Sequence, residues 1–368
     1  MQEDFHYYAT YCAAILAGFS HEESLAICYS DQFVDICSVT YLSKIKAPKK
    51  AATTQLSLEM MDARTDIFGL QDITRIWASF HFLPKDLYAN KKWCSKRYLN
   101  KYRLICGPNG ELLKKTVENA KDKSLQHIGI AMHVLSDTWA HSGFAGTPSL
   151  VINNTNRDFY ELIEENGVEV ERKIKFRHST SSPDDLEKGL FTNTLYQGNE
   201  NHIMNLGHGR AGHFPDYSFA KYKYVPAWGD YHMIVKDNPS DYMKAFTQLI
   251  YALKYLRGDI DSFETDTYDL EAIKGYEDRI DLIFRKRQLS ATEDFKKLGE
   301  ELSGKELPYF DMNKYADEYK NAAKDRKDDT FLGRFIKGAI SHKGLVSDEI
   351  EKSGNALAGF TKIKGIGL

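Results

Sequence analysis

The sequence of 368 residues has few cysteines and no long apolar run. Its five cysteines form an odd set without a Cys-x-x-Cys pair, which argues against a disulfide framework and against a cysteine zinc site. No stretch approaches the roughly 18 to 20 uninterrupted apolar residues that a membrane span needs. The N-terminus carries acids where a secretory signal carries basic residues. We therefore expect a cytoplasmic protein, or one exported without a conventional signal peptide, as a secreted effector is.

A strong charge of one sign and two common catalytic motifs are also missing. The chain has 49 basic and 52 acidic residues, which argues against a duplex nucleic acid partner but leaves room for a local basic patch. It has no Gly-x-Ser-x-Gly nucleophile elbow, so a serine hydrolase of that kind is not expected. It has no Walker-type phosphate loop, which argues against nucleotide-driven work.

Helical patterns dominate what is present, so the predicted fold class is mainly α. Glycines placed as C-terminal stops and a candidate N-terminal cap at Ser240 support several of these helices. The predicted helices are 5–18, 22–38, 109–142 (interrupted or not) and 239–257.

Between residues 145 and 206 turn residues replace the helical pattern, and the run 168–176 alternates like a strand. We expect an irregular or β-hairpin insertion there. The domain prediction is a helical domain over 1–260, interrupted by this insertion, and a charged helical C-terminal extension over 261–368.

Three candidate metal ligands recur at four-residue spacing within one predicted helix. Each residue of an α-helix advances about 100°, so His133, Asp137 and His141 fall within roughly an 80° arc of one face. A single histidine is more often a packed or surface residue, but three ligands at a helical repeat favour a metal-binding face. Gly129 and Ala140 lie beside this arc, and we expect them to leave room for ions and substrate.

Further ligand types lie on both sides of this helix. The turn-rich run after Gly207 offers His208, His213 and Asp216, which indicate either further ligands or a solvent-exposed loop. We favour His208 among the three because Gly207 precedes it.

The N-terminal third adds His6 on the first predicted helix, Asp31 and Asp35 one turn apart on the second, and His81. Taken alone, each of these four residues is as well explained as a cap, a surface charge or a core histidine.

The candidate ligands form an ordered series that resembles that of the zinc-dependent phospholipase C and S1/P1 nuclease superfamily. The series is an early histidine, an aspartate and a further histidine, then the run His133-x-x-x-Asp137 followed by His141, and finally the later histidine cluster. The resemblance covers roughly residues 5 to 216. It implies a helical fold that holds two or three zinc ions, which position a phosphodiester and activate water.

The resemblance also implies roles for individual residues. His133 and His141 are nitrogen ligands, and Asp137 bridges or caps a metal. The upstream ligand roles go to His6, Asp35 and His81 and a downstream role to His208. Asp31 or Asp35 orients the attacking water or accepts its proton.

Two departures mark a divergent member. Relatives commonly ligate a zinc through an N-terminal tryptophan, whereas this chain begins Met1-Gln2, and position 212, where they carry a carboxylate, is glycine. We expect His213 or Asp216 to take the missing role.

The leading functional hypothesis is a phospholipase C that acts on phospholipids, with peripheral membrane contact. A single-strand nuclease of the S1/P1 kind is the alternative enzyme, because aromatic side chains beside the same metals could stack on bases. A non-catalytic toxin or binding protein stabilised by metals is the alternative from another class. The oligomeric state is left open.

Overall fold

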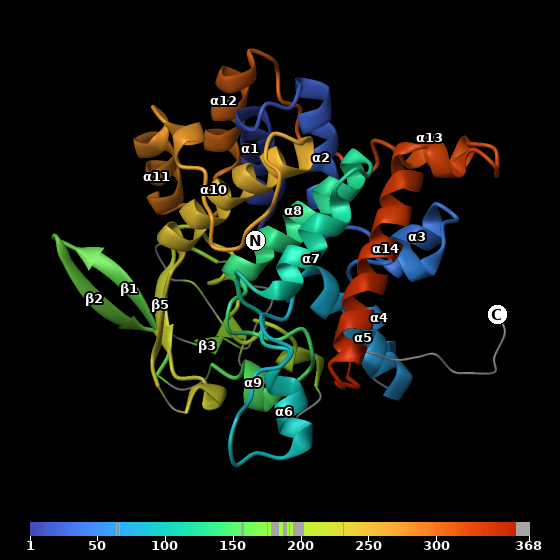
Figure 1. The fold of residues 1–368 in the computed structure, drawn as a ribbon. Helices are drawn as coiled ribbons and strands as arrows, with labels where there is room; N and C mark the ends of the chain where they lie inside the picture. The colour runs from blue at the N-terminus through green and yellow to red at the C-terminus, as the bar shows by residue number, and fades with distance from the viewer. Residues whose placement is uncertain are drawn as a thin grey trace.

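The computed structural model describes residues 1–357 apart from 64, 66, 156–157, 175, 178–183, 187–189, 191, 194–201 and 231. Helices predominate among these residues, and the largest β element is a small antiparallel sheet (Figure 1). The predicted fold class, mainly α with a small β insertion and a C-terminal helix, is therefore confirmed.

The N-terminal half contains most of the elements that carry the candidate ligands. Its helical segments are η1 (Asp4–Ala9, a π-helix), α1 (Thr10–Leu16), α2 (His21–Phe33), α3 (Val39–Lys44), η2 (Lys49–Ala51), α4 (Ser57–Ala63), α5 (Ile67–Phe80), α6 (Lys96–Tyr102), α7 (Glu111–Ala120), α8 (Leu125–Ala140) and α9 (Leu150–Asn153).

The remaining chain supplies the strands and the C-terminal helices. Its elements are β1 (Tyr160–Glu165), β2 (Val168–Lys173), β3 (Phe176–Arg177), β4 (Thr192–Asn193), η3 (Ile203–Asn205), β5 (Lys221–Tyr224), η4 (Ala227–Gly229), β6 (Ile234–Asp237), α10 (Asn238–Arg257), η5 (Glu271–Ile273), α11 (Glu277–Arg285), α12 (Thr292–Ser303), α13 (Ala316–Asn321), η6 (Lys327–Asp329) and α14 (Phe331–Lys352).

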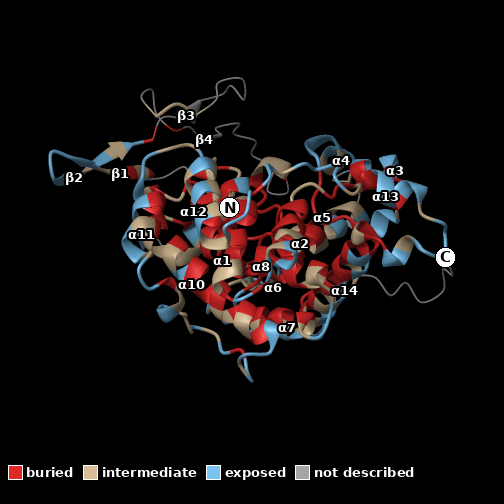
Figure 2. Ribbon diagram, turned by 90° about the horizontal axis from the view of Figure 1, so that it is seen from above, coloured by how far each residue is buried: buried red, intermediate tan, exposed pale blue. Residues whose placement is uncertain are grey.

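Helix α8 runs through the centre of the molecule, where Figure 2 shows buried residues gathered. It packs against α2, α7, α10 and α14, and almost all of its side chains are buried. A Cβ atom at Gly129 would lie 2.4 Å from the carbonyl oxygen of Ile27 on α2. The space at Gly129 is thus filled by the α2 backbone, and the expectation that it holds ions or substrate is wrong.

Most predicted helices are present, with corrected boundaries. The first is split into η1 and α1, and the long third one is interrupted between α7 and α8. Helix α2 ends at Phe33, five residues earlier than predicted. The cap of α10 is Asp237, whose Oδ1 accepts a hydrogen bond from the backbone nitrogen of Ser240 at 3.5 Å, so the assignment of Ser240 as the cap is wrong.

The predicted hairpin is confirmed as β1 and β2, which pair antiparallel with Glu165 opposite Val168. The two residues between them, Asn166 and Gly167, have φ of 53° and 77°, the backbone of a tight primed turn that these residue types favour. Strands β5 and β6, which the sequence patterns do not predict, extend the sheet in the order β2-β1-β5-β6.

The C-terminal helices pack into the same hydrophobic core as the helices before them. Helix α14 lies along α8 and α5, and its Phe335 and Val346 belong to one buried cluster with Leu135 of α8 (Figure 1). Among the described residues no helix combines the length and apolar character needed to cross a bilayer.

Candidate metal centre

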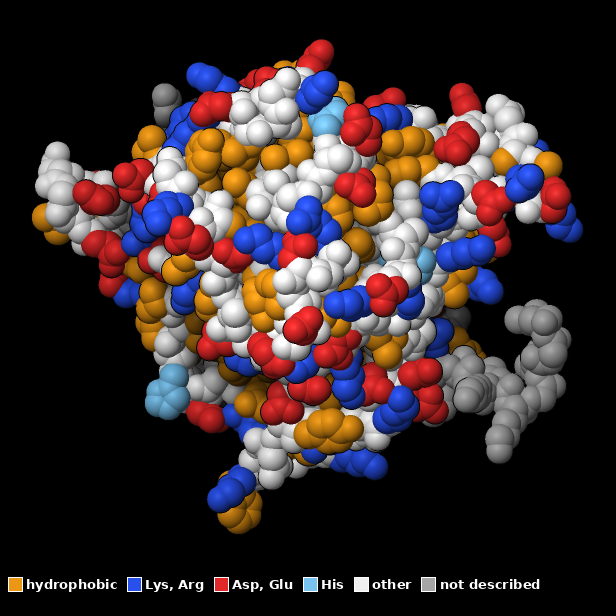
Figure 3. All heavy atoms as spheres, turned by 45° about the horizontal axis from the view of Figure 1, so that its top comes forward, with side chains coloured by type: hydrophobic (Ala, Val, Ile, Leu, Met, Phe, Trp, Pro, Cys, Tyr) orange, Lys and Arg blue, Asp and Glu red, His pale blue; other side chains and the backbone are white. Residues whose placement is uncertain are grey.

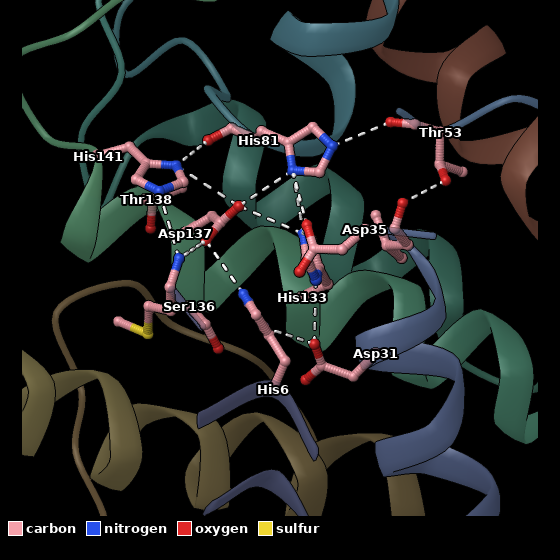
Figure 4. Close-up of polar contacts among 12 residues, drawn as sticks. His6, Asp31, Asp35, Thr53, His81, His133, Ser136, Asp137, Thr138 and His141 are labelled. Atoms are coloured by element: carbon pink, nitrogen blue, oxygen red, sulfur yellow. Dashed lines mark hydrogen bonds and ion pairs between the residues drawn. The ribbon is translucent and has the colours of Figure 1, made fainter. Parts of the chain in front are cut away.

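The predicted ligands, with one exception, converge on the inner face of α8. His133 and Asp137 project from α8 and His141 caps its C-terminus. Figure 4 shows His6, Asp31, Asp35 and His81 gathered around them. The residues brought together are His6, Asp31, Asp35, His81, His133, Asp137, His141, His208 and Asp216.

The first group joins α8 to the loops that follow α2 and α5. His81 Nδ1 and His133 Nε2 lie 3.2 Å apart, and Asp137 Oδ2 is 3.3 Å from each. Asp35 Oδ1 lies 3.6 and 3.8 Å from the same two nitrogens. Four ligands about 2.0–2.1 Å from a tetrahedral zinc ion are separated by about 3.3–3.4 Å. The spacing of His81, His133 and Asp35 therefore fits one such ion, and Asp137 Oδ2 lies beside both histidines.

The second group lies beyond the C-terminus of α8. His141 Nε2 is 3.2 Å from Asp216 Oδ1, and His208 Nε2 is 3.6 Å from Asp216 Oδ2. The amino nitrogen of Met1 lies 3.3 Å from His141 Nε2 and 3.4 Å from Asp216 Oδ1. Two imidazoles, a carboxylate and an amine thus surround one space.

Asp31 lies behind the histidines rather than among the open ligand atoms. Its Oδ1 is 2.7 Å from His6 Nδ1 and 3.1 Å from His133 Nδ1, and its Oδ2 accepts a hydrogen bond from Thr10 Oγ1 at 2.7 Å. The carboxylate is fully buried. This arrangement leaves Nε2 of both histidines facing Asp137, at 3.3 Å in each case.

Three further histidines are held by backbone carbonyl groups. His81 Nε2 donates to Thr53 O at 3.0 Å, His141 Nδ1 to His81 O at 2.6 Å, and His208 Nδ1 to Gly212 O at 2.9 Å. A carbonyl oxygen only accepts, so the proton lies on the tied nitrogen and the other nitrogen keeps its lone pair when the ring is neutral. Metal-bound histidines are oriented in this way.

The electrostatics of the cluster reflect an excess of buried carboxylates. Burial lowers the pKa of His133, but Asp137 and Asp35 outweigh this effect and raise it to about 10. Burial would raise the pKa of Asp137, but His141 and the Met1 amino group hold it well below its usual range. Burial lowers the pKa of His208 to about 4, so this imidazole is neutral at neutral pH, as a metal ligand must be.

Access to solvent is uneven across the cluster. The Asp35 side chain is 32% exposed, whereas those of Asp31, His133 and Asp137 are almost completely buried. His208 and Asp216 are partly exposed. Asp35 is therefore the carboxylate of the first group that solvent reaches.

His213 is the exception among the predicted ligands. Its side chain is 64% exposed and its Nδ1 lies 3.3 Å from Asp184, outside both the first and the second group. Of the two substitutes for a carboxylate at position 212, the structure thus places Asp216, not His213, beside His208.

Sequence reasoning missed several supporting groups. The Met1 amino group donates to Asp137 Oδ1 at 2.6 Å. The sequence did not predict this contact, because Met1 replaces the tryptophan that serves as a ligand in the superfamily the chain resembles. Thr10, which donates to Asp31, lies four residues after His6, so helical spacing could have placed it on the same face as His6. The Thr53 carbonyl has no side-chain signature at all.

Helix α14 supports two segments beside His81, the end of α5 and the segment at Ala52. His342 Nε2 donates to Ser79 O at 2.9 Å, two residues before His81. Lys343 Nζ donates to Ala52 O at 2.9 Å, next to the Thr53 carbonyl that orients the His81 ring. The C-terminal helix thus contributes hydrogen bonds to the surroundings of the site.

The fold and the cluster define a mainly helical protein with a candidate metal site built from histidines and aspartates. A family model, described as a family of unknown function (DUF6765), matches residues 1–350. The chain belongs to this family. No curated protein and no solved structure matches it.

Proposed function

We propose that the cluster binds two or three zinc ions and hydrolyses phosphodiesters, with phospholipids as the substrate. One observation carries this proposal. Five histidines each have one ring nitrogen next to an oxygen of the protein, while the other nitrogen faces the shared carboxylates. A core histidine that serves packing alone has no need of both contacts.

The groups suggest how the ligands are divided. His81, His133, Asp35 and Asp137 would hold the first ion. His141, His208 and Asp216 would hold the second.

A third ion would use His6 and the Met1 amino group, with Asp137 shared between it and the first. Asp137 suits a shared role because Met1 and His6 approach its Oδ1 while His81, His133 and His141 approach its Oδ2.

Charge compensation supports bound cations independently of geometry. Asp31, Asp137 and Asp216 are nearly buried, and uncompensated buried carboxylates are costly. Without metals the cluster has to bind protons to balance these charges. The pKa of His133 is accordingly raised to about 10 and that of the Met1 amino group to about 11. Zinc ions would replace these protons.

The protein groups also suggest the division of work in hydrolysis. Bound zinc ions lower the pKa of water and neutralise charge on a reacting phosphate. Asp35 is the exposed carboxylate of the first group, so it is placed to orient the attacking water and accept its proton. Asp31, which is hydrogen-bonded to His133 and lies 2.7 Å from His6 Nδ1, would hold these rings instead of contacting the water.

The choice of phospholipid rests on the ordered ligand series, which is similar to that of zinc-dependent phospholipase C. The same series also occurs in single-strand nucleases, so the experiment has to offer both substrates. Purified protein is analysed for zinc and then incubated with phosphatidylcholine or with a single-stranded oligonucleotide.

We expect at least two zinc ions per chain and release of phosphocholine. Asp137→Asn should lose zinc and activity, whereas His213→Ala, which changes an exposed histidine outside the groups, should keep both. Zinc content unchanged in Asp137→Asn would refute the metal centre. Oligonucleotide cleavage without phosphocholine release would refute the lipid substrate and leave the metal centre standing.

A further inference from the structure

An exposed loop after His81, together with the first two residues of α6, combines aromatic and basic side chains. We call residues 85–97 the basic aromatic loop. Trp93 is 102% exposed and Tyr88 is 68% exposed, although large aromatic side chains are normally buried to a substantial degree. In Figure 1 the loop lies at the foot of the molecule before α6, and in Figure 3 the lowest point carries hydrophobic and basic side chains.

The charge of the loop contrasts with that of the whole chain. The loop has five basic residues, Lys85, Lys91, Lys92, Lys96 and Arg97, and one acid, Asp86, so its net charge is 5 - 1 = +4. The whole protein carries -3. Within the described part of the chain, ion pairs involve Lys91 but none of the other four bases. A cluster of exposed bases is therefore free to meet an anionic surface.

The loop is anchored at Ala89 and Lys91, just before the exposed Trp93. Lys91 Nζ lies 2.7 Å from both Trp228 O and Asp230 Oδ1, and Arg103 Nε donates to Ala89 O at 2.9 Å. Trp93 has φ of 59°, in the left-handed region that bulky residues seldom adopt. The backbone thus presents this indole to solvent, where it adds nothing to the core.

We propose that the basic aromatic loop docks the protein on an anionic lipid surface. Trp and Tyr favour the level of the lipid headgroups, and lysine and arginine close behind them attract anionic lipids. A nucleic acid strand is the other anion that aromatic and basic residues bind, but it is usually held along a groove. A single projecting tip fits a lipid surface better.

The purpose of docking rests on the proposed phospholipid substrate, but docking itself is measured without hydrolysis. The full-length protein is sedimented with vesicles of phosphatidylcholine alone or with one third phosphatidylserine. We expect binding to the anionic vesicles and a blue shift of tryptophan fluorescence. Trp93→Ala should abolish the shift and weaken binding at least tenfold, with folding intact because the side chain makes no core contact.

Matched charge variants separate the loop from net charge. Each basic residue removed near the surface should weaken binding roughly fivefold. Lys92→Glu with Lys96→Glu should therefore weaken it strongly, whereas Lys305→Glu with Lys324→Glu, exposed lysines elsewhere, should have little effect.

Two results would overturn the docking proposal. The first is equal vesicle binding by the two charge-reversed pairs. The second is loop-dependent binding of a single-stranded oligonucleotide without vesicle binding. Vesicle binding without phosphocholine release would instead refute the lipid substrate and leave docking intact.

Discussion

Substitution of Asp31 by asparagine tests the most specific feature of the candidate centre. Asn keeps the size of the side chain but removes the charge that lies 2.7 Å from His6 Nδ1 and 3.1 Å from His133 Nδ1. Loss of an outer hydrogen-bond partner of a metal-bound histidine typically weakens metal affinity 10- to 100-fold. Because one carboxylate serves two histidines, Asp31→Asn should weaken zinc binding by about 1.4–2.8 kcal/mol at each ion affected.

The assay is competition for zinc between the protein and a chromophoric chelator, combined with hydrolysis measured at saturating zinc. Thr10→Val is the graded control, because it removes a single hydrogen bond to Asp31 and should have a smaller effect on affinity. Wild-type zinc affinity in Asp31→Asn together with lost hydrolysis would refute the reasoning. Asp31 would then act on the water, as the sequence alone allowed.

Two further predictions concern the scaffold around the centre. Gly129→Ala places a Cβ atom 2.4 Å from Ile27 O and should lower the free energy of unfolding by about 1–3 kcal/mol, whereas Gly344→Ala on α14, with open space around it, should be neutral or slightly stabilising in denaturant titrations. Burial lowers the pKa of Lys343 to about 8, so between pH 8 and 10.5 the unfolded chain binds a proton that the folded chain does not. The unfolding free energy of wild type minus that of Lys343→Met should therefore rise across this range, and a flat difference would contradict the assigned burial.

Regular local patterns account for the parts of the fold that the sequence predicted. The four-residue spacing of His133, Asp137 and His141 gives one helix face, and all three side chains reach the cluster. The Asn166-Gly167 pair specifies a tight hairpin turn through its backbone preferences alone. Both signals are contained within a few residues.

Contacts between distant segments account for what the sequence could not predict. The lack of a side chain at Gly129 predicts free space beside the ligand face. Only the packing of α2 on α8 shows that the α2 backbone fills this space. Asp31 and Asp35 lie one helical turn apart, so the sequence pattern does not distinguish their roles. Only their burial in the structure shows that Asp31 is the inner carboxylate and Asp35 the exposed one. Backbone carbonyl groups such as that of Thr53 carry no sequence signal.

The position of α14 has a consequence for how the protein is made. The candidate ligand residues, from His6 to Asp216, leave the ribosome well before Lys343, which donates to the carbonyl of Ala52 beside the Thr53 carbonyl that orients His81. At about 5–20 residues per second, the 343 - 216 = 127 residues between them take roughly 6 to 25 s to synthesise. During this interval the nascent chain holds every candidate ligand without the helix that supports them, so loading of the proposed zinc ions should be completed only after translation.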